Sequence, residues 1–326
     1  MTEILVTLDP HSTFVEDIAA MNAVKGIRFN TAMRLDEPID KVLTSLNQKI
    51  QPKDLWIDLK CRQLRLVNSP TVPPDDLKLN HRIKVHTPTE LRFKELVSGK
   101  DGSKEIYRSV EVEKVMTRAP YILSSGSNKI RLKTPPGLTI RFGYGSAVSI
   151  EDPSLKIYGY LTKKDKELVK QGKELGFHRY MISFTHKESD INDVLSRDPK
   201  AEILAKIEDE EGVNFVEKVY PKLKDRNVHL IAARGDMYEQ LGPFGTLEAV
   251  KKIAKADPKA VAASRFFPSL SKIDVDYEPP ACSDVFDVAY LRELGYDRFL
   301  LGDELCYDKE RLKVGIGLLN NIAKRY

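Results

Sequence analysis

Several features that define common protein classes are scarce in this sequence. Its 326 residues include only three cysteines, Cys61, Cys282 and Cys306, with no CxxC pair. Such a sparse, odd set argues against a disulfide framework and suits structural thiols in a reducing compartment. The six histidines form no i, i+4 pair and have no cysteine at zinc spacing, so no zinc site is expected.

No basic segment precedes a long apolar run, and no window approaches a membrane span. We therefore expect a soluble, cytoplasmic protein.

An excess of one charge is also absent. The chain has 52 basic and 48 acidic residues, a formal charge of +4, and the two signs are well mixed. This balance argues against nucleic acid as a partner and leaves local charge clusters as sites for anionic small molecules. The length exceeds what one compact core usually accommodates, so two domains, or one domain with an insertion, are expected.

What the sequence does contain is a repeating alternation of strand-like and helix-like segments. The strand-like runs are rich in branched apolar residues, and amphipathic segments such as 211–223 and 245–255 lie between them. Eight such strands followed by a final helix predict an α/β fold, a (β/α)8 TIM barrel. The predicted strands are residues 4–8, 26–31, 54–60, 179–185, 202–208, 228–236, 260–265 and 298–304.

One interval breaks this alternation. Residues 66–157 carry many prolines, short alternating runs and few helical patterns. This composition predicts a small all-β domain inserted after the third barrel strand. The predicted division is therefore a barrel of residues 1–65 and 158–326 with an inserted β-rich lid domain of residues 66–157. A hinged cap over the barrel is the expected role of the insertion, and an inert insertion is the alternative.

Polar residues recur in alternation where predicted strands end. In "AKIEDEEGV", Lys206 and Glu208 share one face of a strand whose other residues are apolar. The carboxyl ends of barrel strands line the active-site mouth, so these charges are expected there. A ladder of salt bridges that closes the barrel is the alternative interpretation. The other pairs of this kind are Arg28 and Asn30, Asp58 and Lys60, and Arg234 and Asp236.

These residue types suit a metal and an anion. Glu208 and Asp236 offer the oxygen ligands that Mg²⁺ or Mn²⁺ prefers, with water and substrate completing the coordination. Arg28 and Lys206 would face an anion beside that metal. Gly235 has no Cβ, so a carboxylate can approach the backbone amides of the "RGD" turn. The pattern predicts a phosphorylated or carboxylated substrate.

The segments "AEILAKIEDEEGV", "AARGDM", "WIDLKCRQLR" and "NAVKGIRFNTAM" resemble, in order and spacing, the barrel of pyruvate kinases. So do "AVAASRFF" and "CSDVFDVAYLRELGYDRFLLGDE". The combination is specific, whereas each short motif alone is weak. The resemblance implies a (β/α)8 barrel with an inserted lid, and transfer of phosphate between phosphoenolpyruvate and ADP to give pyruvate and ATP. It also implies a divalent metal, Mg²⁺ or Mn²⁺.

The resemblance implies roles for individual residues. Lys206 matches the lysine that stabilises the transferring phosphoryl group and the enolate, and Arg28 matches the phosphate-binding arginine. Ser264 stands where the family has a threonine that helps to protonate the enolate. The metal carboxylates correspond to Glu208 and Asp236, the substrate turn to Gly235 and Asp236, the monovalent-cation ligands to Asn30 and Asp58, and an arginine near the nucleotide to Arg65.

The sequence departs from the family on the side that binds the nucleotide and the monovalent cation. Ala32 and Leu59 replace a serine and a threonine, and Gln63 replaces a glutamate linked to potassium dependence. We therefore expect K⁺ not to be required, with a basic side chain such as Lys60 or Arg62 supplying the charge. His186 occupies a position that is often arginine in the family.

The chain ends after the eighth predicted helix, so no counterpart of the family's C-terminal regulatory domain is expected. Three functions stay open. The first is a pyruvate kinase-like phosphotransferase. The second is divalent-metal enolate or lyase chemistry on a pyruvate-like 2-oxo acid without a nucleotide. The third is a non-catalytic binder of phosphoenolpyruvate or pyruvate. A homodimer is also expected.

Overall fold

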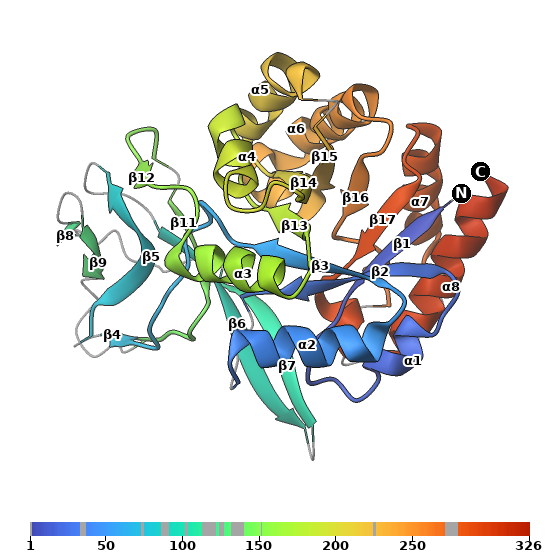
Figure 1. Cartoon of the computed structure of the whole chain (residues 1–326), viewed down its shortest axis with the longest axis horizontal. Coiled ribbons are helices and arrows are strands. Elements are labelled where there is room, and N and C mark those ends of the chain that lie inside the picture. Colours follow the sequence, from blue (N-terminus) through green and yellow to red (C-terminus); the bar gives the residue numbers. More distant parts are fainter. Residues whose placement is uncertain are drawn as a thin grey trace. The chain divides into compact units, whose positions relative to one another are not determined.

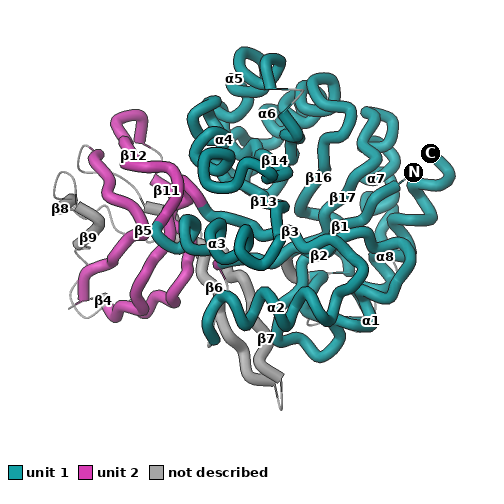
Figure 2. The backbone as a smooth tube through the Cα atoms, in the orientation of Figure 1, with its two compact units in different colours: residues 1–31, 35–60, 163–326 teal, residues 32–34, 61–162 magenta. Residues whose placement is uncertain are grey.

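A computed structural model gives the arrangement of the chain (Figure 1). The structure describes residues 2–32, 37–72, 75–85, 91–101, 104–112, 122–123, 127–131, 140–150, 152–223, 226–270 and 280–326. These residues form two compact units, which Figure 2 distinguishes by colour. Unit 1 comprises residues 1–31, 35–60 and 163–326, and unit 2 comprises residues 32–34 and 61–162.

Unit 1 is a closed parallel barrel of eight strands surrounded by helices, which confirms the predicted (β/α)8 fold. All eight predicted strands are present, although several end earlier than predicted. Around the barrel the order is β1, β2, β3, β13, β14, β15, β16 and β17, with β17 closing onto β1. Their bounds are β1 Glu3–Thr7, β2 Val24–Asn30, β3 Asp54–Leu59, β13 Arg179–Ile182, β14 Glu202–Ile207, β15 Val228–Ala233, β16 Val261–Ala263 and β17 Arg298–Leu301.

The helices of unit 1 follow the strands in sequence. In α6, Gly242 has a φ of 68° and is followed by Pro243, so two helical segments meet at a kink there. No helix among the described residues is both long and apolar enough to cross a membrane. The helices are α1 Val15–Ala19, α2 Ile39–Ile50, α3 Lys163–Glu174, α4 Glu188–Leu195, α5 Glu210–Lys218, α6 Arg234–Ala256, α7 Cys282–Glu293 and α8 Lys309–Arg325, with 3₁₀ turns η1 Tyr220–Lys222 and η2 Asp303–Tyr307.

A layer of buried apolar side chains, one or two from most strands, fills the inside of the barrel. Trp56 is the largest, and Gly26 makes room for it: a Cβ on Gly26 would lie 3.2 Å from the Trp56 ring and 2.9 Å from Leu5. Only glycine fits there without displacing these side chains. The layer consists of Leu5, Trp56, Met181, Leu204, Ile231, Ala233, Val261, Ala263 and Leu300.

The described residues of unit 2 form antiparallel β-strands. Three sheets have the orders β10-β4, β11-β6-β7 and β12-β5-β9-β8. The strands are β4 Thr71–Val72, β5 Leu77–Lys84, β6 Leu91–Asp101, β7 Lys104–Val112, β8 Ile122–Leu123, β9 Ser127–Arg131, β10 Ile140–Arg141, β11 Ala147–Ile150 and β12 Lys156–Tyr158.

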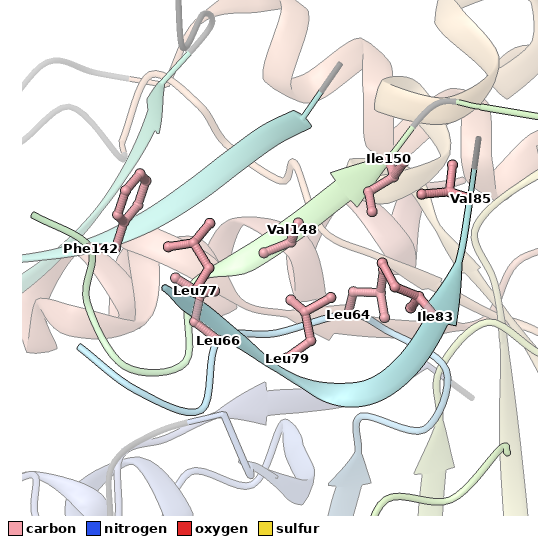
Figure 3. Close-up of a cluster of buried hydrophobic side chains, with 9 residues drawn as sticks. All are labelled: Leu64, Leu66, Leu77, Leu79, Ile83, Val85, Phe142, Val148 and Ile150. Atoms are coloured by element: carbon pink, nitrogen blue, oxygen red, sulfur yellow. The ribbon is translucent and has the colours of Figure 1, made fainter. Parts of the chain in front are cut away.

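Alternation along β5 builds the core of unit 2. Leu77, Leu79 and Ile83 are buried, whereas the intervening Lys78 and Arg82 are exposed. The buried face packs in a cluster with residues from β11 and from the segment after residue 61 (Figure 3). The cluster contains Leu64, Leu66, Leu77, Leu79, Ile83, Val85, Phe142, Val148 and Ile150.

Candidate functional site

The candidate site begins where the interior layer of the barrel ends. Side chains two residues apart on a strand share a face, so residues that follow the apolar layer by two or four positions continue the interior face at the carboxyl ends. Leu204 is thus followed by Lys206 and Glu208, and Trp56 by Asp58. The same spacing relates Leu5 to Thr7, Gly26 to Arg28 and Leu300 to Gly302.

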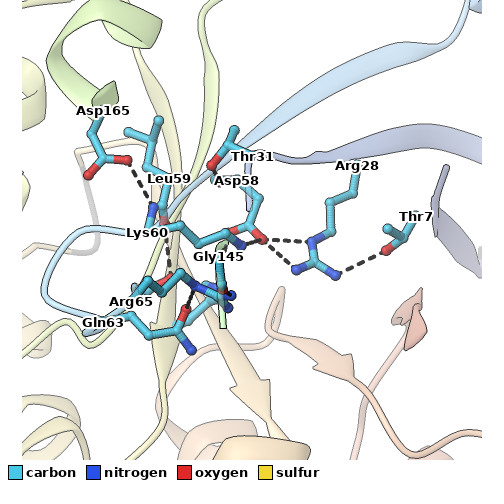
Figure 4. A network of polar contacts seen from close by, with 12 residues as sticks. Thr7, Arg28, Thr31, Asp58, Leu59, Lys60, Gln63, Arg65, Gly145 and Asp165 are labelled. Carbon is cyan, nitrogen blue, oxygen red and sulfur yellow. Dashed lines mark hydrogen bonds and ion pairs between the residues drawn. The ribbon is translucent and has the colours of Figure 1, made fainter. Parts of the chain in front are cut away.

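Asp58 is the centre of a network of cations. Arg28 donates from Nε to Asp58 Oδ2 at 2.9 Å and also from Nη2 to that oxygen. Lys60 Nζ donates to Oδ2 at 2.7 Å (Figure 4). Lys206 Nζ lies 3.0 Å from Oδ1, an ion pair whose geometry is not that of a hydrogen bond. The remaining Nη1 of Arg28 donates to Thr7 Oγ1 at 3.1 Å.

Charge compensation makes this buried network possible. Asp58 is completely buried, and burial alone would raise the pKa of its carboxyl. Arg28, Lys206 and Lys60 outweigh that effect and hold the pKa well below its usual value. Burial would likewise lower the pKa of Lys206, but Asp58 and Glu208 raise it above its usual value. Both groups are therefore ionised near neutral pH.

Glu208 is also buried, but fewer cations contact its carboxyl than contact that of Asp58. Its Oε2 accepts the Phe184 backbone N–H at 2.5 Å. Its Oε1 has no hydrogen-bond partner among the described residues, although Lys206 Nζ lies 3.6 Å away. Burial raises the pKa of Glu208 to about 8; Lys206 opposes this rise and the carboxyl of Asp236 adds to it. A second cation beside the two carboxyls would therefore be favourable.

The turn that carries Asp236 begins a helix. Strand β15 ends at Ala233, earlier than predicted, and residues 234–236 form the first turn of α6. A Cβ on Gly235 would lie 3.4 Å from Ser264 Cβ and 3.7 Å from Ser264 Oγ, so Gly235 and Ser264 are neighbours. The glycine thus leaves the Ser264 hydroxyl uncovered on that side.

Arg234 was predicted to share the strand face of Asp236 at the barrel mouth, but its side chain contacts Asp287 and the Ser264 carbonyl. Its Nη1 donates to both carboxylate oxygens of Asp287 in α7, at 2.6 and 2.9 Å, and its Nη2 donates to the Ser264 carbonyl at 2.7 Å. Its guanidinium also packs over the Phe266 ring, 4.3 Å from the centroid. The strand alternation ends with β15, so it does not determine the direction of the Arg234 side chain. Arg234 instead joins α6 to α7 and binds the carbonyl of Ser264.

Two of the residues predicted for the cation and nucleotide side lie on neighbouring strands of the barrel. Asn30, at the end of β2, is in register with Asp58 on β3. Arg65 belongs to unit 2, where it donates from Nη1 to the Gly145 carbonyl at 2.6 Å and from Nε to Gln63 at 2.9 Å. A role for Arg65 beside a nucleotide stays a prediction.

Two contributions were missed by sequence reasoning. The first is the Phe184 backbone N–H, which donates to Glu208. Almost every residue type has such a group, so the sequence does not indicate this contact. The second is Thr7, whose hydroxyl accepts from Arg28. Thr7 ends β1 two residues after the interior Leu5, so extending the strand-end alternation to β1 identifies it.

Glu208 and Asp236 fit a Mg²⁺-type site. Such ions are commonly held by one or two carboxylates, with water and substrate phosphates as the other ligands. The buried Oε1 of Glu208 and the neighbouring Asp236 carboxyl supply that pair. Within the described ranges, no group of three or more histidine, cysteine or acidic side chains could hold a metal ion. Water molecules or substrate oxygens would complete the coordination of an ion held by these two carboxylates.

Comparison with known proteins gives one distant similarity. No protein-family model matches the chain. The pyruvate kinase of Borreliella burgdorferi is 22% identical over an alignment of 344 positions that covers the whole chain and 68% of that protein. This weak similarity along the full length supports a pyruvate kinase-like relationship.

Proposed function

We propose that this protein transfers phosphate between phosphoenolpyruvate and ADP, giving pyruvate and ATP. The observation that carries the proposal is the position of Lys206 between Asp58, 3.0 Å away, and Glu208, 3.6 Å away. A fixed ammonium there adjoins both the cation network and the carboxyl pair. The similarity to a pyruvate kinase along the whole chain supports this reaction.

In this proposal Arg28, oriented by Thr7 and Asp58, binds the phosphate of phosphoenolpyruvate. Lys206 stabilises the charge on the phosphoryl group as it moves and on the enolate that remains. These groups are positioned by buried contacts before the substrate binds, so little reorganisation is needed. Ser264, supported by Arg234 at its carbonyl, then helps to protonate the enolate.

Glu208 and Asp236 would hold Mg²⁺ or Mn²⁺, and the bound ion would neutralise charge on the phosphate and the substrate carboxylate. The amides of Gly235 and Asp236 would receive that carboxylate. The Lys60 ammonium, 2.7 Å from Asp58, supplies the monovalent charge, so we propose that K⁺ is not required.

A second candidate is nucleotide-free enolate or lyase chemistry on a pyruvate-like 2-oxo acid. It is favoured by one observation: Lys206, the carboxyl pair and Ser264 all belong to unit 1, whereas Arg65, the residue predicted beside the nucleotide, belongs to unit 2. Enolate chemistry needs only the unit 1 residues. A non-catalytic binder of phosphoenolpyruvate or pyruvate is the third candidate function.

One experiment separates these functions. Pyruvate release from phosphoenolpyruvate is measured with Mg²⁺, with and without ADP, and exchange of the methyl protons of pyruvate in D₂O is followed without nucleotide. We expect ADP-dependent release that is lost in Lys206→Ala and retained in Lys166→Ala, a control at an exposed lysine of α3. Exchange without any ADP-dependent release would favour the second candidate. Absence of both activities in folded protein would leave a binder and contradict the kinase proposal.

The lid role of the inserted unit and the homodimer stay predictions from the sequence. Digestion of the free and substrate-bound protein by a protease tests the lid, because closure should protect residues 66–157. Sedimentation equilibrium tests the dimer.

A further inference from the structure

His186 joins two loops at the carboxyl ends of neighbouring barrel strands. It follows β13, and its Nε2 lies 2.9 Å from Oδ2 of Asp209, the residue directly after Glu208. Its Nδ1 lies 2.9 Å from the carboxylate of Glu211. The His186 side chain is only 10% exposed, whereas that of Glu211 is 75% exposed. The contact with Asp209 is therefore the better shielded of the two.

A second contact joins the same loops two residues away. The Phe184 N–H donates to Glu208 Oε2 at 2.5 Å. Phe184 has a φ of 48°, a left-handed conformation that is unfavourable for a bulky residue and persists only when neighbouring contacts hold it. Its ring packs edge-on against the His186 ring, with centroids 6.4 Å apart. Phe184 and His186 thus contact Glu208 and Asp209, respectively.

Asp209 is itself held firmly. Its Oδ1 accepts the Gly212 N–H at 2.8 Å and caps the N-terminus of α5. A Cβ on Gly212 would lie 3.2 Å from Ile207 Cγ2, so α5 packs closely against the end of β14. On the other side, the His186 N–H donates to Asp190 in the first turn of α4 at 3.0 Å. His186 therefore connects a fixed α5 to a fixed α4.

We infer that His186 is a positioning residue for the metal carboxylate: by binding Asp209 it keeps the Phe184 amide on Glu208 Oε2 and so directs Oε1 toward the ion. The inference rests on the proposed metal role of Glu208. Residues that orient a metal ligand through hydrogen bonds commonly affect metal affinity by about 10-fold to 100-fold. His186 touches neither the ion nor the substrate in this account.

Isothermal titration with Mn²⁺ tests the inference without measuring turnover. We expect His186→Ala to weaken Mn²⁺ binding by about 10-fold. His186→Gln retains a hydrogen-bond donor for Asp209, so its Mn²⁺ affinity should fall less. The guanidinium of His186→Arg can reach both carboxylates, so this variant should retain most of the wild-type Mn²⁺ affinity. Glu211→Gln is the matched control, because it removes only the exposed contact, and it should bind Mn²⁺ as the wild type does.

The outcomes are distinguishable from those that concern the proposed function. If folded His186→Ala and His186→Gln bind Mn²⁺ as tightly as the wild type, the positioning role is wrong and the metal site stands. If the wild type binds no Mn²⁺, the metal role of Glu208 and the positioning role are both wrong. If His186→Ala does not fold, the Mn²⁺ affinities of His186→Gln, His186→Arg and Glu211→Gln are compared instead. Equal Mn²⁺ affinities in all three variants would overturn the inference.

Discussion

The Lys60 ammonium lies 2.7 Å from Oδ2 of Asp58, and both side chains are buried. Together with Arg28 and Lys206, it surrounds one carboxylate with three protein cations. A carboxylate predicted to bind a monovalent cation is therefore already compensated by the chain itself. This relationship links the buried charge of the barrel to the proposed independence from K⁺.

The first prediction concerns this cation. Pyruvate formation by the wild type should be equal in K⁺ and in tetramethylammonium salts, because Lys60 already compensates Asp58. Lys60→Met should reduce turnover by about 10-fold or more, since a charge-assisted hydrogen bond of about 1.5–3 kcal/mol is lost. Lys166→Met, at an exposed lysine, serves as the control. A wild-type rate that depends on K⁺ would contradict the role given to Lys60.

The second prediction is a pH dependence of metal binding. Glu208 must lose its proton to bind a cation, and burial raises its pKa to about 8. Apparent Mn²⁺ affinity should therefore fall by about tenfold for each pH unit below 8. Calorimetry in two buffers of different ionisation enthalpy should also detect proton release on binding. An affinity that does not change over about pH 6 to pH 9 would be inconsistent with a buried, protonated Glu208.

The third prediction is a stability gain from removing the Glu208 charge. The folded-state pKa of about 8 exceeds the ordinary value of 4.5, so ionisation of Glu208 destabilises the fold progressively as pH rises between these values. Glu208→Gln avoids this cost. In chelator, its free energy of unfolding should exceed that of the wild type by a few kcal/mol at most at high pH, with no gain near pH 4.5. Urea unfolding across pH checks this, and a gain independent of pH would refute it.

The fourth prediction concerns the opposite end of the barrel. Asp257 precedes β16 and accepts the backbone N–H groups of Leu230 and Lys259 at 2.8 and 2.9 Å. Burial would raise its pKa, but the contacts with His229, Leu230 and Lys259 lower it below 3.8. Its stabilising effect should therefore be present above pH 3.8 and be lost as pH falls below that value.

Asp257→Ala should accordingly destabilise the protein by about 1–3 kcal/mol at neutral pH, because buried donors lose their acceptor. Thermal or urea unfolding measures this, with Asp193→Ala, at an Asp193–Arg197 pair on the surface, as the control. The difference from the wild type should shrink in acid. A difference that grows in acid would exclude the assigned role.

The barrel could be predicted because its strands are apolar, short and regularly separated by amphipathic segments. The candidate site was predicted from the same period of two, which continues from Leu204 to Lys206 and Glu208. That rule failed at Arg234, since the chain turns into α6 after Ala233 and alternation no longer applies. Contacts made by the backbone, such as that of the Phe184 N–H with Glu208, cannot be predicted from the types of the residues.

Pairing between charged residues was the least predictable part of the site. Lys60 and Arg62 were equally plausible sources of a compensating cation, and only the structure distinguishes them, by placing Lys60 on Asp58. Arg62 instead packs over the Tyr160 ring in unit 2, 4.8 Å from its centroid. Side chains of similar length and charge differ here through the direction of the backbone, which turns at Cys61 with a φ of 46°.

The most direct test of the central claim follows phosphorus itself. ³¹P NMR of phosphoenolpyruvate with ADP and Mg²⁺, in K⁺-free buffer, reports where the phosphate goes, with Lys206→Ala as the control. We expect the phosphoenolpyruvate signal to be replaced by that of the γ-phosphate of ATP, and Lys206→Ala to produce no ATP. Phosphoenolpyruvate that stays intact at high concentrations of folded enzyme, or phosphate that appears only as the free ion, would exclude the proposed phosphate transfer to ADP.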